Sequence, residues 1–441
     1  MIALLSGAGH RSRLRDGRQR IRRLLGSAAG TAAAVVRRVP MPTGVRRVLA
    51  RLFVWRRGTE WVPLERVLLG GQNGLSAGAF AEAHHDLLWP SRRVSEGPHT
   101  DLLRAAAGHT VTEQEILAST YAVLGRDCIA ATGEFFSAVD DAGIIEIASD
   151  FLTRDTAPRH RAPGPRRRHQ SDPRDPVLLA PIRDSGCYQV VDGHHRLAAG
   201  VIDGAIGVRA RIRRTSVSTP LQDLLEKMSW IGGGHELYQP ISSPELDDSW
   251  TTVRRCTDRL ASMDSVLADI GLEPGSSYLD VASCYGWFVR AMGDRGYRAE
   301  GVERDPLAPG LGAAVYGLDP SVVHTGDAVG YLEDADDRWD VVSCFSLLHH
   351  FVLGRGSVDA VALMKLLDGA TARVLFIDTG QAHEAWFRNS LADWDTARVQ
   401  RFLETEGTFD RVVDLGADGD AVAPYEENYG RHLFACIRDA T

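Results

Sequence analysis

The C-terminal part of the chain alternates short apolar runs with segments of helical spacing. Continuous apolar runs of this length are typical of parallel strands buried on both faces, and their alternation with helices indicates an α/β sheet. The predicted strands occupy 277–283, 298–304, 322–328, 339–346 and 372–379. Two later runs, 409–416 and 431–438, lie close together in the sequence. We expect them to form a terminal antiparallel pair.

The region before Ser277 has a different pattern. A strand-like run at 62–70 is followed by a mainly helical region to about Leu152. The segment 154–176 is rich in proline and arginine and has almost no apolar residues, which indicates an exposed inserted loop. A strand, a turn, a second strand, a helix and a third strand then fill 176–214. This mixture predicts an N-terminal α+β domain.

These patterns divide the 441 residues into four parts. We predict a basic arm over 1–57, an α+β domain over 58–215, a linker over 216–250 and an α/β domain over 251–441. In the arm, apolar residues and arginines alternate at nearly helical spacing near its end. An amphipathic basic helix can lie on an anionic membrane surface. A flexible tail and a helix docked on the rest of the chain are the alternatives.

Charge is distributed unevenly along the chain. The arm holds fourteen arginines and one acid, Asp16, so it carries +13, and the remaining residues carry −21 of the total of −8. The acidic body argues against a nucleic-acid binder, because phosphate contacts need clustered bases. No apolar run reaches the roughly 18 residues of a membrane helix. Six scattered cysteines without a CxxC pair indicate free thiols in a cytoplasmic protein, and we expect no metal site.

Acidic residues end three consecutive predicted strands. Asp280 leads into a tight turn of small residues, Glu303 follows 23 residues later, and Asp327 ends the third strand. In doubly wound sheets, ligands bind beyond the carboxyl ends of the strands, and small residues let the backbone approach a cofactor. The spacing between Asp280 and Glu303 suits a carboxylate that accepts both hydroxyls of a ribose.

Four ordered segments, LDVASCYGWF, GVERD, TGDAV and WDVVSCFSLLHHF, resemble the motifs of class I S-adenosylmethionine-dependent methyltransferases. The resemblance covers about 250–440. It implies a Rossmann-like doubly wound sheet that ends in an antiparallel hairpin, with S-adenosylmethionine as the cofactor. The cofactor-binding residues that it implies are Asp280, Ala282, Ser283, Gly286, Glu303, Asp327 and Ala328. The family usually has glycines where this chain has Ala282 and Cys284.

Two histidines follow the fourth predicted strand, where the reacting methyl group should lie. His349 or His350 could act as the base that an alcohol acceptor needs, because imidazole is close to neutral at cytosolic pH. Packing within the following helix is the alternative. A phosphate or carboxylate acceptor needs no base and favours cationic groups. The candidate acceptor-binding residues are Asp378, at the end of the fifth strand, and Arg254, Arg255 and Arg259.

The segment VVDGHHRLAAG carries a second signal. A predicted strand ends at Asp192, Gly193 permits a tight turn, and His194, His195 and Arg196 open a helix. A helix N-terminus with free amide groups and a guanidinium forms an anion site, so we expect these five residues to bind phosphate or a nucleotide.

This segment resembles the phosphate-binding box of the ParB/sulfiredoxin superfamily, over about 60–213. The DGHHR form is most similar to the free serine kinases, which implies ATP and Mg²⁺ as ligands. Sulfiredoxin activity is disfavoured, because it needs a cysteine where His194 stands. The kinase's catalytic glutamate has no clear counterpart; the candidates are Glu65, Glu113 and Glu115. A domain retained only for substrate binding or dimerisation is the alternative.

Three functions are compatible with these motifs. The first is O-methylation of a glycan, sugar or secondary metabolite, with the phosphate-binding domain as an accessory. The second is a bifunctional kinase-methyltransferase that phosphorylates and then methylates its acceptor. The third is a ParB-like DNA-binding protein, which the acidic body opposes. The expected partners are a small-molecule or glycan acceptor, a second copy of the chain, and a membrane surface in contact with the arm.

Overall fold

A computed structural model of the chain provides the fold. It describes residues 58–71, 92–156, 176–228 and 235–439. The expectations for the basic arm, 1–57, lie outside the described residues, and so does most of the inserted loop predicted at 154–176.

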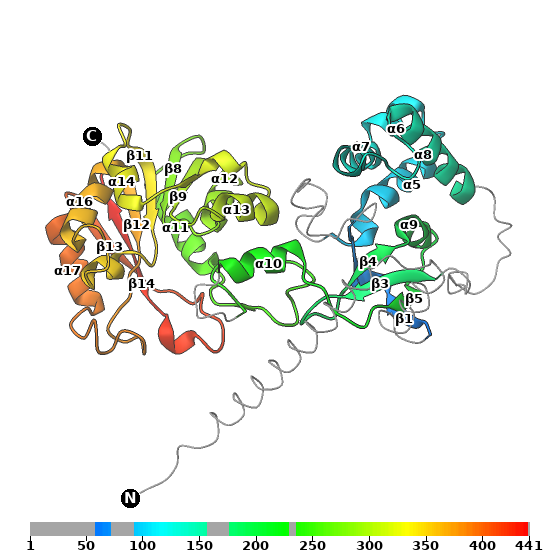
Figure 1. The fold of residues 1–441 in the computed structure, drawn as a ribbon. Helices are drawn as coiled ribbons and strands as arrows, with labels where there is room; N and C mark the ends of the chain where they lie inside the picture. The colour runs from blue at the N-terminus through cyan, green and yellow to red at the C-terminus, as the bar shows by residue number, and fades with distance from the viewer. Residues whose placement is uncertain (1–57, 72–91, 157–175, 229–234, 440–441) are drawn as a thin grey trace, which may run out of the picture. The chain divides into compact units, whose positions relative to one another are not determined.

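The chain forms two units (Figure 1). Unit 1 comprises Met1–Asp223 and Ser243–Asp248, and unit 2 comprises Leu224–Ser242 and Ser249–Thr441. The stretch 216–250, for which we predicted a linker, therefore contributes residues to both units.

Unit 1 contains a five-stranded mixed sheet in the order β1-β5-β3-β4-β2. The strands are β1 (Glu60–Pro63), β2 (Val67–Leu68), β3 (Val177–Pro181), β4 (Tyr188–Asp192) and β5 (Gly207–Ile212). Its helices are α5 (Pro98–Gly108), α6 (Glu113–Ala118), α7 (Thr120–Thr132), α8 (Asp141–Thr156) and α9 (His194–Ile202). Leu102, Tyr121, Ile144 and Leu179 belong to one continuous apolar core that joins these helices to the sheet.

The run predicted as one strand at 62–70 is split in the structure. A 3₁₀ turn at Leu64–Arg66 separates β1 from β2, which lie on opposite edges of the sheet. In a flat five-stranded sheet the two edge strands would be about 19 Å apart. The four peptide units from Pro63 to Val67 span at most about 14 Å. The sheet of unit 1 must therefore curl so that its two edges approach each other.

Unit 2 contains a seven-stranded sheet in the order β10-β9-β8-β11-β12-β14-β13. The strands are β8 (Ser277–Val281), β9 (Arg298–Glu303), β10 (Val323–Thr325), β11 (Trp339–Cys344), β12 (Thr371–Ile377), β13 (Arg411–Ala417) and β14 (His432–Ile437). Each run predicted in this region forms a strand. The first five strands are parallel, and β14 is antiparallel to both β12 and β13, which confirms the predicted terminal pair.

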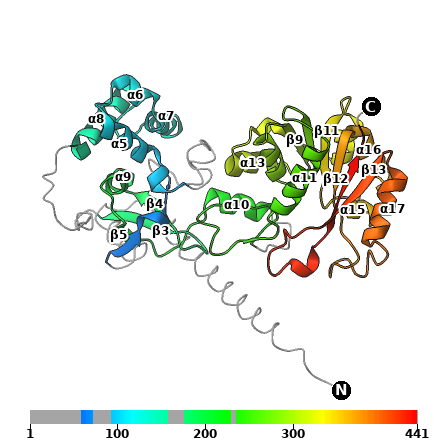
Figure 2. The same ribbon diagram turned by 180° about the vertical axis from the view of Figure 1, so that it is seen from behind.

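Helices cover both faces of this sheet (Figures 1 and 2). The helices of unit 2 are α11 (Thr257–Asp269), α12 (Trp287–Gly293), α13 (Ala308–Tyr316), α14 (Ala328–Glu333), α15 (Leu348–Val352), α16 (Ala360–Ala370) and α17 (Thr396–Glu406). Tyr278 packs with α11 and α12 on one face, whereas the next residue, Leu279, packs with α14, α16 and α17 on the other. The helix α10 (Pro220–Lys227) contains the boundary between the two units. No helix of the described residues has the length and apolarity needed to cross a membrane.

Candidate functional site

The turn after β8 has an alternating left-handed backbone. Ala282, Cys284 and Gly286 have φ angles of 62°, 54° and 88°. Glycine adopts this region freely, whereas a residue with a Cβ pays roughly 1–2 kcal/mol. Ala282 and Cys284 therefore keep a backbone conformation that glycine usually adopts. The turn has the shape that allows close approach of a ligand, at the cost of local strain.

The same turn lies tightly against β9. The Ser283 N–H donates to the Val302 carbonyl at 3.0 Å. A Cβ on Gly301 would lie 2.7 Å from the side chain of Ser283, so only glycine fits at that position. The Ser283 hydroxyl is buried and has no hydrogen-bond partner within the described residues. It remains available to a ligand, and an unsatisfied buried hydroxyl is otherwise unfavourable.

Asp280 is the penultimate residue of β8 and carries a buried carboxyl group. It accepts a hydrogen bond from the Ser343 hydroxyl at 2.6 Å, and that hydroxyl accepts one from Tyr278, also at 2.6 Å. Burial raises the pKa of Asp280 to about 7. A carboxyl group in this state changes its charge near neutral pH when a cation binds beside it.

Glu303 ends the neighbouring strand β9 and faces the same turn. Its two oxygens accept the N–H groups of Cys284 and Asp305, at 3.0 and 3.2 Å. Burial raises its pKa above the ordinary value. The backbone thus fixes the carboxylate, and each oxygen keeps a lone pair for one hydroxyl of a ribose.

Asp327 follows β10 and caps α14, which begins at Ala328. One of its oxygens accepts the N–H groups of Val329 and Gly330, at 3.1 and 3.3 Å. The cap satisfies helix donors that would otherwise be unpaired. The other carboxylate oxygen of Asp327 makes neither of these bonds. Asp327 is the residue that we predicted to bind the adenine.

Gln239 is a site residue that the sequence reasoning missed. It is buried, its Nε2 donates to the Ser283 carbonyl, and its Oε1 accepts the Trp287 N–H, both at 3.1 Å. The Tyr285 hydroxyl bonds with both the N–H and the carbonyl of Gln239, at 2.9 Å each. Gln239 therefore holds both ends of the turn that leads into α12. Its position in a polar stretch before the first strand gave no signal of this role.

The two candidate catalytic histidines differ in their surroundings. His349 is buried, and its Nδ1 accepts the Gly380 N–H at 3.1 Å. Burial, aided by Arg431, lowers the pKa of His349 to about 2, so the ring is neutral. His350 is exposed, and its ring centroid lies 4.3 Å from that of His349. Partial burial and nearby arginines lower the pKa of His350.

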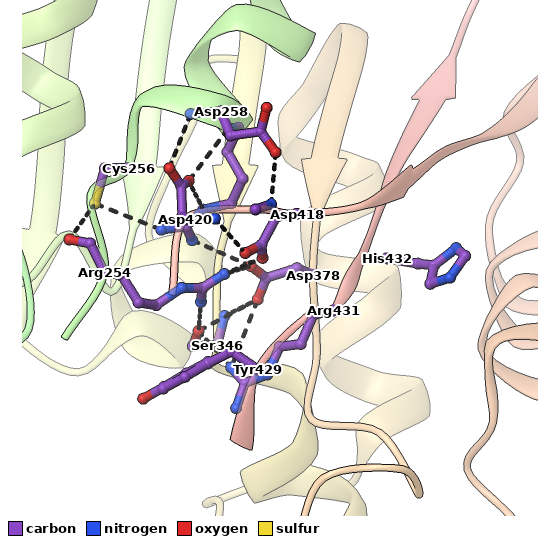
Figure 3. Close-up of polar contacts among 12 residues, drawn as sticks. Arg254, Cys256, Asp258, Ser346, Asp378, Asp418, Asp420, Tyr429, Arg431 and His432 are labelled. Atoms are coloured by element: carbon purple, nitrogen blue, oxygen red, sulfur yellow. Dashed lines mark hydrogen bonds and ion pairs between the residues drawn. The ribbon is translucent and has the colours of Figure 1, made fainter. Parts of the chain in front are cut away.

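Several buried charged side chains form a cluster near the end of β11, which we call the buried ion cluster; Figure 3 shows most of its members. Its members are Arg254, Arg259, Arg431, Asp378, Asp418, Asp420 and Glu384. Asp378 lies at the centre and pairs with Arg254 at 3.3 Å and with Arg259 at 3.1 Å. Arg431 binds Glu384 through two nitrogens, at 2.9 and 2.8 Å. Breaking a buried pair of this kind typically costs about 3–5 kcal/mol.

The buried ion cluster contains three of the four residues predicted to bind the acceptor. Arg254 also pairs with Asp418, and Arg259 pairs with Asp420 at 3.2 Å. Burial opposes the charge of Asp378, yet the arginines hold its pKa well below its usual range. The fourth residue, Arg255, is exposed. The structure thus brings Arg254, Arg259 and Asp378 together, but it pairs them with partners from within the chain.

Ser346 joins the buried ion cluster to the end of β11. It has a left-handed backbone with φ 58°, and its N–H donates to Asp378 at 2.7 Å. Its hydroxyl accepts hydrogen bonds from Arg254 at 3.1 Å and from Arg431 at 2.7 Å. Strained residues of this kind are concentrated at functional sites. The sequence reasoning quoted the motif that contains Ser346 without singling it out.

The second predicted site lies in unit 1, at the start of α9. Gly193 has φ 111° and precedes the helix, whose first turn has no side-chain cap. Asp192 and Arg196 form an ion pair at 2.9 Å. His194 is buried, and its Nε2 accepts the Gly70 N–H at 3.4 Å. The structure therefore places all these residues around one helix N-terminus.

Aromatic rings surround the same helix start. His195 lies 2.8 Å from the Tyr121 hydroxyl, and its ring packs against Phe151 at a centroid distance of 4.4 Å. His99 is buried, and its ring stacks on His194 at 5.4 Å. Burial lowers the pKa of His99 well below its usual value and that of His194 to about 3. Within the described residues, no group of three histidines, cysteines or acids has the geometry of a metal site.

Comparisons with known proteins give weak matches. No protein-family model and no curated protein matches the sequence. A crystal structure of WbdD, a bifunctional kinase-methyltransferase, matches with 17% identity, TM-score 0.38, and coverage of 50% of this chain and 47% of WbdD. The chain thus spans about half of WbdD. Magnesium protoporphyrin IX methyltransferase from Synechocystis PCC 6803, with bound S-adenosylmethionine, matches with 16% identity, TM-score 0.29, and coverage of 42% and 83%. Such TM-scores carry no weight for function.

Proposed function

We propose that unit 2 is an S-adenosylmethionine-dependent methyltransferase. The observation that carries this proposal is the placement of Asp280, Glu303 and Asp327 at the carboxyl ends of the three adjacent parallel strands β8, β9 and β10. A left-handed turn opens beside the first two acids. Crevices at this edge of a doubly wound sheet are where cofactors bind.

The residues present fit such a cofactor. Glu303 would accept the ribose hydroxyls, and Asp327 would accept from the adenine amino group. Asp280 would interact with the cationic amino acid end, whose charge favours its ionised form. The bound cofactor supplies an electrophilic methyl group, so the main task of the chain is to align the acceptor with it. The acceptor is an oxygen of a glycan, sugar or secondary metabolite.

Calorimetric titration with S-adenosylmethionine tests this proposal. We expect the wild-type protein to bind, and we expect Asp280→Ala and Glu303→Ala to lose most of the affinity, because each removes an acceptor of charge-assisted hydrogen bonds. Glu404→Ala on the exposed side of α17 is the matched control. Absence of binding to the wild-type protein, or equal affinity in all three variants, contradicts the proposal.

We also propose that unit 1 binds the phosphate groups of a nucleotide through a ParB-like domain. The supporting observation is the uncapped start of α9, at Gly193, with Arg196 on its first turn. This makes a bifunctional kinase-methyltransferase, with ATP and Mg²⁺ at unit 1, the second candidate function. Consumption of ATP with candidate acceptors, and its loss in Arg196→Ala, is the expected result. A protein that consumes no nucleotide with any acceptor contradicts kinase activity.

A further inference from the structure

Trp386 is the one exposed large apolar side chain among the described residues of unit 2. It lies in the loop between β12 and α17, and 47% of its surface is exposed. Its ring lies 5.7 Å from that of Tyr429, between centroids, at an interplanar angle of 78°. Because the two rings are nearly perpendicular, Tyr429 can cover at most one face of the indole. We call the open face the Trp386 platform.

The contacts of Tyr429 connect the Trp386 platform to the end of β11. The Tyr429 ring packs against the guanidinium groups of Arg254 and Arg431, at 4.8 and 4.9 Å (Figure 3). Both guanidinium groups donate to the hydroxyl of Ser346, which lies just beyond β11. The platform therefore stands on the same side chains that fix the end of this strand.

The loop that carries Trp386 also contacts a candidate catalytic histidine. Phe387 directly follows Trp386 and is half-buried, and its ring lies 4.8 Å from that of His349. The loop passes closely at Gly380, where a Cβ would lie 2.6 Å from Phe387 and 3.1 Å from His349. This tight packing fixes the loop and holds Trp386 one residue away from a contact with His349.

An amide group beside the Trp386 platform lacks a hydrogen-bond partner. The Ala385 N–H donates to the Glu427 carbonyl at 3.4 Å, which joins the loop of Trp386 to the turn at Glu426–Asn428. Asn428 is half-buried, and its Oδ1 is buried with no partner within the described residues. A carbonyl oxygen in this state is unfavourable unless a ligand donates to it, and hydroxyl groups are suitable donors.

The charges near the Trp386 platform favour a neutral ligand. The guanidinium groups under Tyr429 belong to the buried ion cluster, which contains three arginines and four acids. Arg431 binds Glu384 through two nitrogens, and Arg254 pairs with two aspartates. The cluster therefore has no net positive charge with which to attract an anion.

The isolation of Trp386 discriminates among the ligands that stack on an indole. A protein partner needs a cluster of apolar and aromatic side chains at the core of its interface. An aromatic small molecule binds preferentially in an enclosed pocket lined by several apolar groups. A sugar ring needs neither. The partially positive C–H groups on one of its faces pack on the negative face of the indole, while its hydroxyl groups bond to polar neighbours and water.

We infer that the Trp386 platform binds a sugar ring of the methyl acceptor, and that the Asn428 amide accepts a hydrogen bond from one of its hydroxyl groups. This inference rests on the proposed methyltransferase function of unit 2, and it selects a sugar or glycan from the proposed acceptors. A sugar bound on the platform lies against the loop that contacts His349.

Saturation-transfer NMR on the full-length protein tests the platform. The probes are the methyl glycosides of glucose, galactose, mannose, rhamnose and N-acetylglucosamine, with phenol as the aromatic alternative. Because a single ring has few atoms, we expect a dissociation constant on the order of 1 mM for at least one sugar. Trp386→Ala should weaken this binding about tenfold or more, because the stacking face is lost.

Trp61→Ala is the matched control, since Trp61 is 45% exposed and lies in unit 1. It should bind the sugar as the wild-type protein does. Trp386→Phe should keep part of the affinity, whereas Trp386→Leu should lose it, because leucine is apolar but has no aromatic face. Asn428→Asp keeps the acceptor oxygen and should bind the sugar, whereas Asn428→Leu should bind it about fivefold more weakly or worse.

The inference is overturned if no sugar binds, if phenol alone binds, or if the sugar binds equally well to Trp386→Ala. It is also overturned if sedimentation shows a dimer that Trp386→Ala dissociates and the sugars do not bind, because Trp386 then belongs to a protein interface.

Calorimetry with S-adenosylmethionine separates this inference from the methyltransferase proposal. Trp386→Ala should leave the affinity for the cofactor unchanged, because Trp386 lies outside the proposed cofactor site. If the cofactor binds but the sugars ignore Trp386, only the sugar site is wrong. If the sugars bind through Trp386 but the cofactor does not bind, the methyltransferase proposal is wrong, and the bound sugar is not a methyl acceptor.

Discussion

The charge of Asp280 provides a sharp test of the proposed cofactor site. The carboxyl group is buried, accepts one hydrogen bond from Ser343, and has its pKa raised to about 7 by burial. S-adenosylmethionine carries positive charge on its amino group and its sulfur, and positive charge favours the ionised carboxylate. Binding below pH 7 should therefore expel a proton from Asp280.

The size of the effect follows from this pKa. Roughly one molecule in eleven is ionised at about pH 6 and roughly ten in eleven at about pH 8. The dissociation constant should therefore fall about tenfold between these pH values, with about 0.9 protons released per cofactor at the lower pH and about 0.1 at the higher. Calorimetry in two buffers of different ionisation enthalpy measures both quantities.

Asp280→Asn keeps the shape of the side chain and removes its charge. We expect its affinity to be independent of pH and weaker than wild type by about tenfold to a hundredfold at about pH 8, from the loss of a charge-assisted bond. Without bound cofactor, Asp280→Asn should have a larger free energy of unfolding than the wild-type protein. The pKa of about 7 in the folded protein lies above the ordinary value of 3.8, so the carboxyl group of Asp280 lowers stability as pH rises between these two values. The gain is at most about 4 kcal/mol. A wild-type affinity that ignores pH, or the same pH dependence in the variant, refutes the reasoning.

Three further predictions concern stability. Ala282→Gly should raise the urea-measured free energy of unfolding by up to about 1 kcal/mol, because it relieves the left-handed strain, whereas Ala282→Val should lower it; the opposite order would contradict the strain. Gln239→Ala should lower that free energy by about 2 kcal/mol or more and weaken cofactor binding, with the half-buried Gln400→Ala on α17 as the control. The buried neutral rings of His99 and His194 cannot take up protons that the unfolded chain gains below pH 6.5, so stability should fall with acid by roughly 1.4 kcal/mol per pH unit per ring. His99→Phe should remove about half of this slope, and an unchanged slope would show that His99 is not its source.

The elements of unit 2 were predictable because their signals are local. Each strand is a continuous apolar run, and a strand buried on both faces needs such a run whatever its neighbours are. The positions of Asp280 and Glu303 at the carboxyl ends of β8 and β9 could be predicted for the same reason, since the local pattern shows where each strand ends. The division of 62–70 into β1 and β2 could not be predicted from the sequence. It depends on tertiary pairing, because β1 pairs with β5 and β2 pairs with β4.

The buried ion cluster could not be predicted from local sequence patterns, because its partners are far apart in the sequence. Arg254 and Asp418 are 164 residues apart, and Arg259 and Asp378 are 119 apart. Arginines on the first turn of a helix and before it are normally solvated, so the sequence indicated cationic groups open to an acceptor. Only the folded chain supplies the three acids that pair with Arg254 and Arg259, which are Asp378, Asp418 and Asp420. The cluster also explains why Ser346 tolerates its left-handed backbone, since two guanidinium groups and Asp378 hold it there.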